Sequence, residues 1–226
     1  MKTTIQEDCS FITYRQKNRD VEEMKKRSRL FFKFVNSRRT IRDFSDQPIP
    51  EEVIENIVRS ASTAPSGAHK QPWTFCVVKS PEIKKQIRKA AEQQEQESYN
   101  GRMTEEWRKD LACLGTDWHK PFIEVAPYLI VVFKRSYELE EGNYKHQNYY
   151  VTESCGLACG FLLAAIHDAG LVALTYTPSP LNFLSKILHR PANEKPFLVV
   201  PVGYPAKDCR IPDLKRKSLK QIIQWF

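Results

Sequence analysis

The sequence has no apolar run long enough to cross a bilayer as a helix. Its longest such run, from Cys155 to Ile166, is flanked closely by Glu153 and Asp168, whereas a spanning helix needs about 20 apolar residues. The N-terminus is polar and charged and does not resemble a signal peptide. We therefore expect a soluble, cytoplasmic protein with no membrane span in this chain, anchored to a membrane only if a longer natural form exists.

Metal-binding and disulfide patterns are also missing. Cys155 and Cys159 are four residues apart on a predicted helix, but no histidine stands at a spacing suited to zinc. An even number of cysteines in a chain of 226 residues is not the pattern of a small disulfide-stapled domain. We expect reduced thiols and no metal site. None of the six cysteines forms a CxxC pair; they are Cys9, Cys76, Cys113, Cys155, Cys159 and Cys209.

Several well-known ligand motifs are absent as well. The chain contains neither G-x-x-x-x-G-K-[ST] nor G-x-G-x-x-G, which argues against P-loop and Rossmann proteins. It has no G-x-S-x-G, which argues against an α/β-hydrolase. The formal charge of +8 favours anionic partners. Because the basic residues are spread along the chain without a nucleic-acid motif, we expect no nucleic-acid partner and favour a phosphate-bearing small ligand.

The spacing of apolar residues predicts one α+β domain with a mixed central sheet wrapped by helices. Residues 1–20 are polar and unpatterned and are expected to form a flexible N-terminal arm. The domain is expected to cover residues 21–226, including a tail, 206–226, that ends on apolar side chains and should dock against a partner copy. Helices are predicted over 21–36, 51–62, 81–99, 148–169 and 178–188, and strands over 73–78, 128–133, 171–175 and 197–202.

The loop over residues 63–73 carries two prolines and a glycine between a helix pattern and a strand pattern. Proline breaks helical hydrogen bonding, so this loop leaves backbone N–H groups that can point at a ligand. An ordinary helix-to-strand connection explains the same residues.

Two separate groups of arginines could hold a phosphate dianion. Arg38, Arg39 and Arg42 follow the first predicted helix, and Arg216 lies far away in the basic tail. Guanidinium groups bind phosphate through paired hydrogen bonds. A solvated basic turn is the alternative for each group.

Taken together, these motifs resemble the FMN-binding nitroreductase fold and, within it, the iodotyrosine deiodinases. The resemblance covers about residues 22–220. It implies a nitroreductase-like, intertwined homodimer that uses FMN to dehalogenate mono- and diiodotyrosine reductively to tyrosine and iodide. The electrons would come ultimately from NADPH, with a separate NADPH-dependent reductase as a further partner. The matching segments are 37–42, 64–69, 71–73, 175–178, 190–192, 201–205 and 212–217, with Trp107 and the region 118–120.

The resemblance also assigns the cofactor contacts. Thr177 would donate its hydroxyl to flavin N5, which lets the flavin deliver electrons one at a time. Tyr176 stands where the family carries a threonine and places a bulkier group near the flavin. The implied FMN contacts are Arg38, Arg39, Thr40, Ile41, Arg42, Pro65, Ser66, Thr175, Tyr176, Thr177 and Arg216.

On the substrate side, the resemblance implies that Glu95, Tyr99 and Lys120 grip the zwitterion of a halotyrosine. Glu95 and Tyr99 are four residues apart, so a helix places them on one face. The region 92–120 would then be a lid that orders over the substrate. The Ala68 N–H would hold the substrate phenolate oxygen, which makes Ala68 and Thr177 the implied catalytic residues.

Two alternative functions remain open. The first is an NAD(P)H-dependent nitroreductase or flavin reductase of the same fold, against which the Glu95, Tyr99 and Lys120 set argues, because a nitroaromatic needs no zwitterion clamp. The second is a protein that binds flavin or halotyrosine without catalysis, against which Thr177 argues.

Overall fold

The computed structural model describes residues 11–139 and 144–226 and divides the chain into two units. In the first unit, residues 11–20 have no regular secondary structure and precede helix α1 (Val21–Ser37). Asp20 accepts the backbone N–H of Glu23 at 2.8 Å at the start of this helix. The predicted helix over 21–36 is confirmed. The flexible arm stays a prediction, and its residues 1–10 lie outside the described residues.

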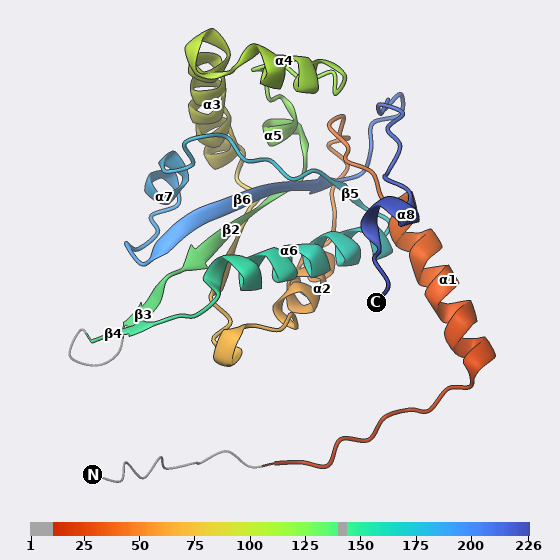
Figure 1. Cartoon of the computed structure of the whole chain (residues 1–226). Helices are drawn as coiled ribbons and strands as arrows, with labels where there is room; N and C mark the ends of the chain where they lie inside the picture. Colours follow the sequence, from red (N-terminus) through yellow and green to blue (C-terminus); the bar gives the residue numbers. More distant parts are fainter. Residues whose placement is uncertain (1–10, 140–143) are drawn as a thin grey trace. The chain divides into compact units, whose positions relative to one another are not determined.

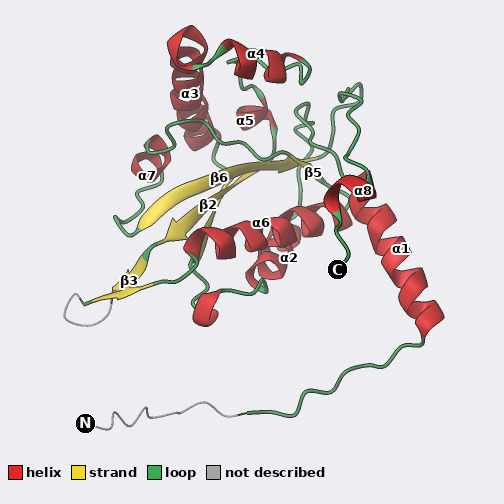
Figure 2. Ribbon diagram, viewed as in Figure 1, coloured by secondary structure: helices red, strands yellow, loops and turns green. Residues whose placement is uncertain are grey.

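The second unit, Arg38–Phe226, is a four-stranded sheet with helices on both faces (Figures 1 and 2). Its strands follow the order β1 (Trp73–Val78), β2 (Tyr128–Arg135), β6 (Glu194–Gly203) and β5 (Val172–Ala173). A separate hairpin joins β3 (Tyr137–Leu139) to β4 (Lys145–Gln147). The helices are α2 (Glu51–Ser62), α3 (Pro81–Glu97), α4 (Glu105–Ala112), α5 (Phe122–Val125), α6 (Val151–Asp168), α7 (Phe183–Ile187) and α8 (Leu219–Ile222), with short turns η1 (Gly67–His69) and η2 (Ser98–Arg102).

Strand β2 is the centre of the core because both of its faces are covered. Ile130 and Val132 pack in the cluster that includes residues of α2 and α6. Leu129, Val131 and Phe133 point to the other face, where α3, α5 and α7 contribute. A strand buried on both faces carries a continuous apolar run rather than an alternating one. This is why the sequence alone predicted a strand here.

The predicted α+β, nitroreductase-like class is confirmed. Within the described residues, every pair of named strands is antiparallel. The parallel part of the expected mixed sheet is the isolated bridge between Thr40 and Ala173. That bridge attaches the arginine-bearing segment after α1 to the sheet beside β5.

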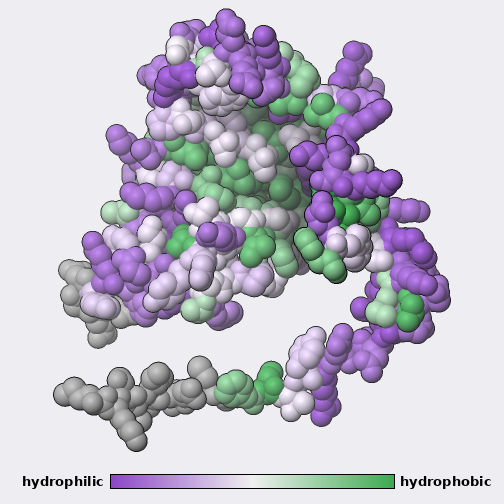
Figure 3. All heavy atoms as spheres, in the orientation of Figure 1, coloured by the Kyte–Doolittle hydropathy of each residue, from purple (hydrophilic) through white to green (hydrophobic). Residues whose placement is uncertain are grey.

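Helix α6 lies along one face of the sheet and exposes its other side (Figure 1). Leu162 and Ile166 are buried against the sheet, while Leu157 and Phe161 are 49% and 45% exposed. Gly156 and Gly160 face open space, since no atom lies within 4 Å of the position that a Cβ would take. Figure 3 shows pale and apolar surface over this helix, whereas the surface over α3 and α4, at the top of the view, is strongly hydrophilic. The open face of α6 is therefore suited to a close helix contact.

The tail contains α8 and ends on apolar side chains that are exposed, among them Ile222 and Trp225. The predicted docking of residues 206–226 stays a prediction. No helix in the described ranges is long and apolar enough to traverse a bilayer.

Candidate functional site

Helix α3 has a first half that packs in the core and a polar second half that extends beyond it. Ser80 caps the helix by accepting the N–H of Ile83, and Ile87 and Ala91 bury its first half. The second half is polar and leads through the π-helical turn η2 to α4 (Figure 1). A helix end with few core contacts is weakly tied to the domain.

A cavity of about 220 Å³, which we call the lid pocket, opens between this overhang and the sheet. It brings together Glu95, Tyr99 and Lys120, the three residues predicted to hold a zwitterion. The predicted residues Thr175, Tyr176 and Thr177 line it as well. The remaining lining residues are Arg42, Gln94, Ser98, Met103, Trp107, Leu111, Thr116, Phe122, Leu174 and Ser179.

Lys120 and Glu95 form an ion pair inside the lid pocket. The Lys120 Nζ lies 3.7 Å from Glu95 Oε2, and the two side chains are 4% and 16% exposed. Lys120 also donates to Thr116 Oγ1 at 3.4 Å and to the carbonyl of Asp117. Burial lowers the pKa of Lys120, an effect that Glu95 partly opposes. Two opposite charges are thus held close together in surroundings where an unpaired charge is costly.

The backbone that carries Lys120 is anchored to α3 by Glu92. Its Oε1 accepts the Lys120 N–H at 2.8 Å and the Arg88 Nε at 2.7 Å. Burial acts to raise the pKa of Glu92, but the hydrogen bonds from Arg88 and Lys120 outweigh it, so the pKa lies below its usual value. Glu92 therefore stays charged near neutral pH and fixes the segment that presents Lys120.

Tyr99 faces Glu95 from η2. Its hydroxyl donates to the carbonyl of Thr116 at 3.3 Å, which ties η2 to the segment before Lys120. Burial, followed by the charges of Glu95 and Asp117, raises the pKa of Tyr99. The phenol is therefore protonated and can donate to a ligand.

The segment 175–177 continues the line of β5 as extended backbone. Tyr176 pairs with Val199 of β6 through two backbone hydrogen bonds of 2.8 and 2.9 Å. Because side chains alternate along extended backbone, Tyr176 is buried while Thr175 and Thr177 are exposed. The rings of Tyr176 and Phe122 pack edge to face, with their centroids 5.4 Å apart. Lys120 Nζ lies 5.8 Å from the centroid of the Tyr176 ring.

A second cavity, the arginine pocket, joins the two arginine groups of the sequence. Arg38 and Arg39 lie there with Arg216, whose Nη2 donates to the carbonyl of Arg38 at 3.0 Å. Arg39 donates to the carbonyl of Pro212. Of the described lining residues, five are cationic and none is acidic. The lining set is Arg38, Arg39, Thr40, Arg42, Leu114, Pro212, Leu214, Lys215 and Arg216.

Arg42 lines both cavities and so connects them. Burial lowers the pKa of Arg42, and the charge of Asp43 opposes that effect. Ile41, another predicted contact, is buried, and its N–H donates to Ala173 at 3.2 Å. This hydrogen bond fixes Ile41 beside the sheet, and Ile41 lines neither cavity.

Pro65, Ser66 and Ala68 line neither the lid pocket nor the arginine pocket. Their loop packs on the start of α6, where Gly67 N–H donates to Ser154 Oγ at 3.3 Å. Ser66 Oγ accepts the N–H of Gln71 at 2.9 Å. Ala68 is exposed and has a φ of 47°, in the left-handed region that L residues rarely adopt. The structure thus groups most predicted site residues in two connected cavities and places this loop elsewhere in the chain.

The sequence prediction missed several residues that line the lid pocket. Trp107 and Leu111 are the clearest, since they stand four residues apart on α4 and share a face. Met103 is buried beside them. The signal in the sequence was an apolar pair, four residues apart, on an otherwise polar helix. In the structure that helix has no buried residue. No group of residues in the described ranges has the composition of a metal site.

Comparison with known proteins gives consistent matches over most of the chain. The family model described as the nitroreductase family matches residues 35–204. An iodotyrosine deiodinase of Haliscomenobacter hydrossis is 63% identical over 214 residues, which cover 95% of this chain and 96% of that protein. Iodotyrosine deiodinase 1 of Homo sapiens is 45% identical over 221 residues, covering 96% of this chain and 76% of that protein.

Solved structures match as well. An iodotyrosine deiodinase bound to FMN and 3-iodo-L-tyrosine superposes with a TM-score of 0.73 at 29% identity, covering 86% of this chain and 99% of that one. A nitroreductase-like protein from Streptococcus mutans superposes with a TM-score of 0.64 at 18% identity, covering 88% and 99%. This second likeness concerns the fold alone.

Proposed function

The chain belongs to the nitroreductase family and, within it, to the iodotyrosine deiodinases, and from this premise we propose that it removes iodide reductively from mono- and diiodotyrosine, with FMN as cofactor. The observation that carries the proposal is the lid pocket, which a largely buried carboxylate and a buried ammonium line together with Thr177. A free amino acid offers the complementary pair of charges.

The arginine pocket fits the phosphate of FMN. Burial, followed by the charges of Arg216 and Arg39, lowers the pKa of Arg38. A phosphate dianion would offset this crowding of like charges and accept paired hydrogen bonds. Arg38, Arg39, Thr40, Arg42 and Arg216 would therefore hold the cofactor's phosphate and ribityl chain. When bound and reduced, FMN would supply the two electrons that, with one proton, replace the carbon–iodine bond with a carbon–hydrogen bond and release iodide.

The residues of the lid pocket would orient the amino acid. Glu95 would accept the substrate ammonium, and Lys120 would hold the substrate carboxylate, so the internal ion pair at 3.7 Å is exchanged for two pairs with the ligand. Tyr99 would turn its phenol hydrogen from the carbonyl of Thr116 to the same head group. Because the site is largely shielded from water, each contact is stronger than it would be on the surface.

Thr175 and Thr177 line the lid pocket and are exposed, on the face of the extended segment opposite to the Tyr176 ring. We assign Thr177 the role of hydrogen-bond donor to the flavin ring at N5. A hydroxyl group can rotate to donate or accept, so Thr177 can follow the change in protonation at that atom. Thr175 and the backbone of Tyr176 would lie against the ring.

Pro65, Ser66 and Ala68 enter the site in this proposal from a second copy of the chain. They line neither cavity of their own chain, and the open face of α6 offers an apolar, glycine-lined surface for a homodimer. The tail 206–226 would dock against the second copy of the chain. The partner's Ala68 N–H would then hold the phenolate oxygen of the substrate.

NADPH is proposed as the ultimate electron source, delivered through a separate reductase. The described cysteines are free thiols, which suits a reducing compartment such as the cytoplasm. An NAD(P)H nitroreductase of the same fold would have no use for the buried Glu95 and Lys120 pair.

The proposal is tested first by the protein's colour and ligand preference. Purified protein should be yellow and should release FMN on denaturation, and it should bind 3-iodotyrosine by calorimetry. A colourless protein that takes up no FMN, or an FMN-loaded protein that reduces nitroaromatics and ignores iodotyrosine, would contradict it.

A further inference from the structure

The phenol oxygen of Tyr176 is buried and forms no hydrogen bond of regular geometry with another described residue. The side chain is 7% exposed, and within residues 11–139 and 144–226 its oxygen has no hydrogen-bond partner. A buried hydroxyl without a partner is destabilising, and such groups are uncommon in folded proteins. Two hydrogen bonds with Val199 fix the backbone of Tyr176, and the ring packs against Phe122.

The surroundings of this phenol are the charged groups of the lid pocket. Lys120 Nζ lies 5.8 Å from the ring centroid, and Phe122 packs its edge against the ring. Burial, followed by the charge of the Glu95 carboxylate and by hydrogen bonding to it, raises the pKa of Tyr176, so the phenol stays protonated and already lies toward Glu95 without forming a hydrogen bond of regular geometry. Tyr176 is therefore a hydrogen-bond donor that faces the Glu95 side of the pocket.

The ion pair between Glu95 and Lys120 accounts for the lack of a regular hydrogen bond from the Tyr176 hydroxyl. Glu95 Oε2 is turned to Lys120 at 3.7 Å. A zwitterion that enters the pocket draws Lys120 toward its own carboxylate and leaves Glu95 to meet its ammonium. The second oxygen of the Glu95 carboxylate then needs a hydrogen-bond donor, because little water reaches it. An ionised carboxylate accepts more than one hydrogen bond.

We propose that Tyr176 is a positioning residue, whose hydroxyl donates to the Glu95 carboxylate when an amino-acid zwitterion occupies the lid pocket. This rests on the proposed function of that pocket. The hydroxyl makes the pocket selective for ligands that carry an ammonium group, because it holds the acceptor of that group in place. Ligands with only a halophenol ring gain nothing from it.

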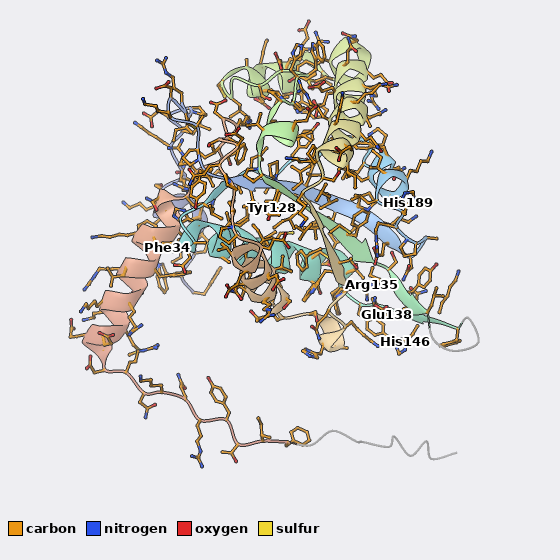
Figure 4. The ribbon with its side chains drawn as sticks, turned by 180° about the vertical axis from the view of Figure 1, so that it is seen from behind. Phe34, Tyr128, Arg135, Glu138, His146 and His189 are labelled. Atoms are coloured by element: carbon orange, nitrogen blue, oxygen red, sulfur yellow. The ribbon has the colours of Figure 1, made fainter. Side chains whose placement is uncertain are left out.

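The test compares two buried tyrosines that have the same exposure. Tyr128 is also 7% exposed, but its hydroxyl donates to the carbonyl of Ile49 at 3.2 Å, in the core on the other face of the sheet (Figure 4). Calorimetric titration of the FMN-loaded protein with 3-iodotyrosine should give a Kd about tenfold higher for Tyr176→Phe than for wild type. Tyr128→Phe should bind 3-iodotyrosine as wild type does.

Two further measurements separate positioning from general packing. Titration with 2-iodophenol, which has no ammonium, should give the same Kd for wild type and Tyr176→Phe. In a Glu95→Ala background, Tyr176→Phe should change the Kd for 3-iodotyrosine less than about twofold. Tyr176→Leu also lacks the hydroxyl and serves as a second variant, with the same loss specific to the zwitterion.

The outcomes are distinguishable from failure of the proposed function. Wild-type protein that binds no iodotyrosine would contradict the proposed function and this inference with it. Tight binding by wild type with an unchanged Kd for Tyr176→Phe would overturn the inference alone. An equal loss for 2-iodophenol, or an equal loss without Glu95, would overturn it too.

Discussion

Lys120 Nζ and Glu95 Oε2 face each other across 3.7 Å in the lid pocket, and both side chains are almost closed off from solvent. The pair comes from two elements far apart in sequence, since Glu95 lies on α3 and Lys120 precedes α5. Each charge is the complement of one end of an amino acid. In the proposed function, a zwitterion would replace this internal ion pair with one pair at each of its own charges.

Removing either half of the clamp should weaken substrate binding strongly. Lys120→Ala and Glu95→Gln should each reduce the binding free energy of 3-iodotyrosine by ~2–5 kcal/mol, because a buried ligand charge then loses its partner. Calorimetry on the FMN-loaded protein measures this. Glu97→Gln is the matched control on the same helix, since its side chain is 52% exposed and pairs with Arg102 at 3.8 Å. Kd values within twofold of wild type for both clamp variants would remove the zwitterion clamp.

The arginine pocket should recognise the phosphate of the cofactor rather than its ring. Arg39→Ala should weaken FMN binding by about 2 kcal/mol, as expected for a lost hydrogen bond between charged groups. Riboflavin, which has no phosphate, should bind both proteins equally. Fluorescence titration of the flavin-free protein measures both ligands. Lys217→Ala is the control, because Lys217 lies next to Arg216 and outside the pocket lining. An equal loss for FMN and riboflavin would show that Arg39 contacts no phosphate.

The two buried tyrosines should differ in their effect on stability. Tyr128→Phe deletes a made hydrogen bond and leaves the Ile49 carbonyl unpaired, so it should lower the free energy of unfolding by about 1 kcal/mol. Tyr176→Phe deletes a hydroxyl with no partner in the described chain and should leave stability unchanged or raise it. Chemical denaturation of the flavin-free protein measures both. A larger loss for Tyr176→Phe than for Tyr128→Phe would contradict the assignment of an idle donor.

Glu194 should make stability depend on pH in the acid range. Its side chain is 3% exposed and meets Arg190 at 2.7 Å and Arg135 at 3.6 Å, and it accepts from Thr74 at 2.7 Å. Burial acts to raise the pKa of Glu194, but the hydrogen bonds from Arg190 and Thr74 outweigh it and hold the pKa below 4.5. Arg135 lies at the end of β2 toward the β3 hairpin, beside Glu138 (Figure 4).

The sign of this effect follows from proton binding. Below pH 4.5 the unfolded chain takes up a proton at this carboxyl before the folded protein does, so the stabilisation is fully present above pH 4.5 and is lost as the pH falls through the folded pKa. Glu194→Gln should therefore lower the free energy of unfolding by about 3 kcal/mol at pH 7, with a smaller difference from wild type in acid. Urea denaturation at pH 7 and at about pH 3.5, below that reference value, measures the change. A difference that does not shrink in acid would contradict the ionised state of Glu194.

The sequence was most informative where local chemistry decides the structure. The bounds of α2 and β1 were predicted to the residue, because proline, glycine and apolar spacing mark their ends. The β3 and β4 hairpin was missed, since its short strands are largely polar and carry no buried face. Strand β5 is shorter than predicted because only Val172 and Ala173 pair with β6 in the ladder.

Most of the residues predicted for the site line the two cavities, and their roles stay predictions. Periodicity placed Glu95 and Tyr99 on one face, and the resemblance supplied Lys120. It could not show that Ala68 lines neither cavity of its own chain, because the path of the loop depends on its packing against α6 rather than on spacing. The idle hydroxyl of Tyr176 was also hidden, since it depends on the rotation of an extended segment against β6.

Anaerobic titration of the reduced protein tests the central claim most directly. The FMN-loaded protein is reduced with dithionite, freed of excess reductant and mixed with diiodotyrosine, while flavin absorbance and free iodide are recorded. We predict reoxidation of the flavin with one iodide and one monoiodotyrosine formed for each flavin oxidised. Flavin that stays reduced in the presence of bound diiodotyrosine, with no iodide released, would contradict the proposed reaction.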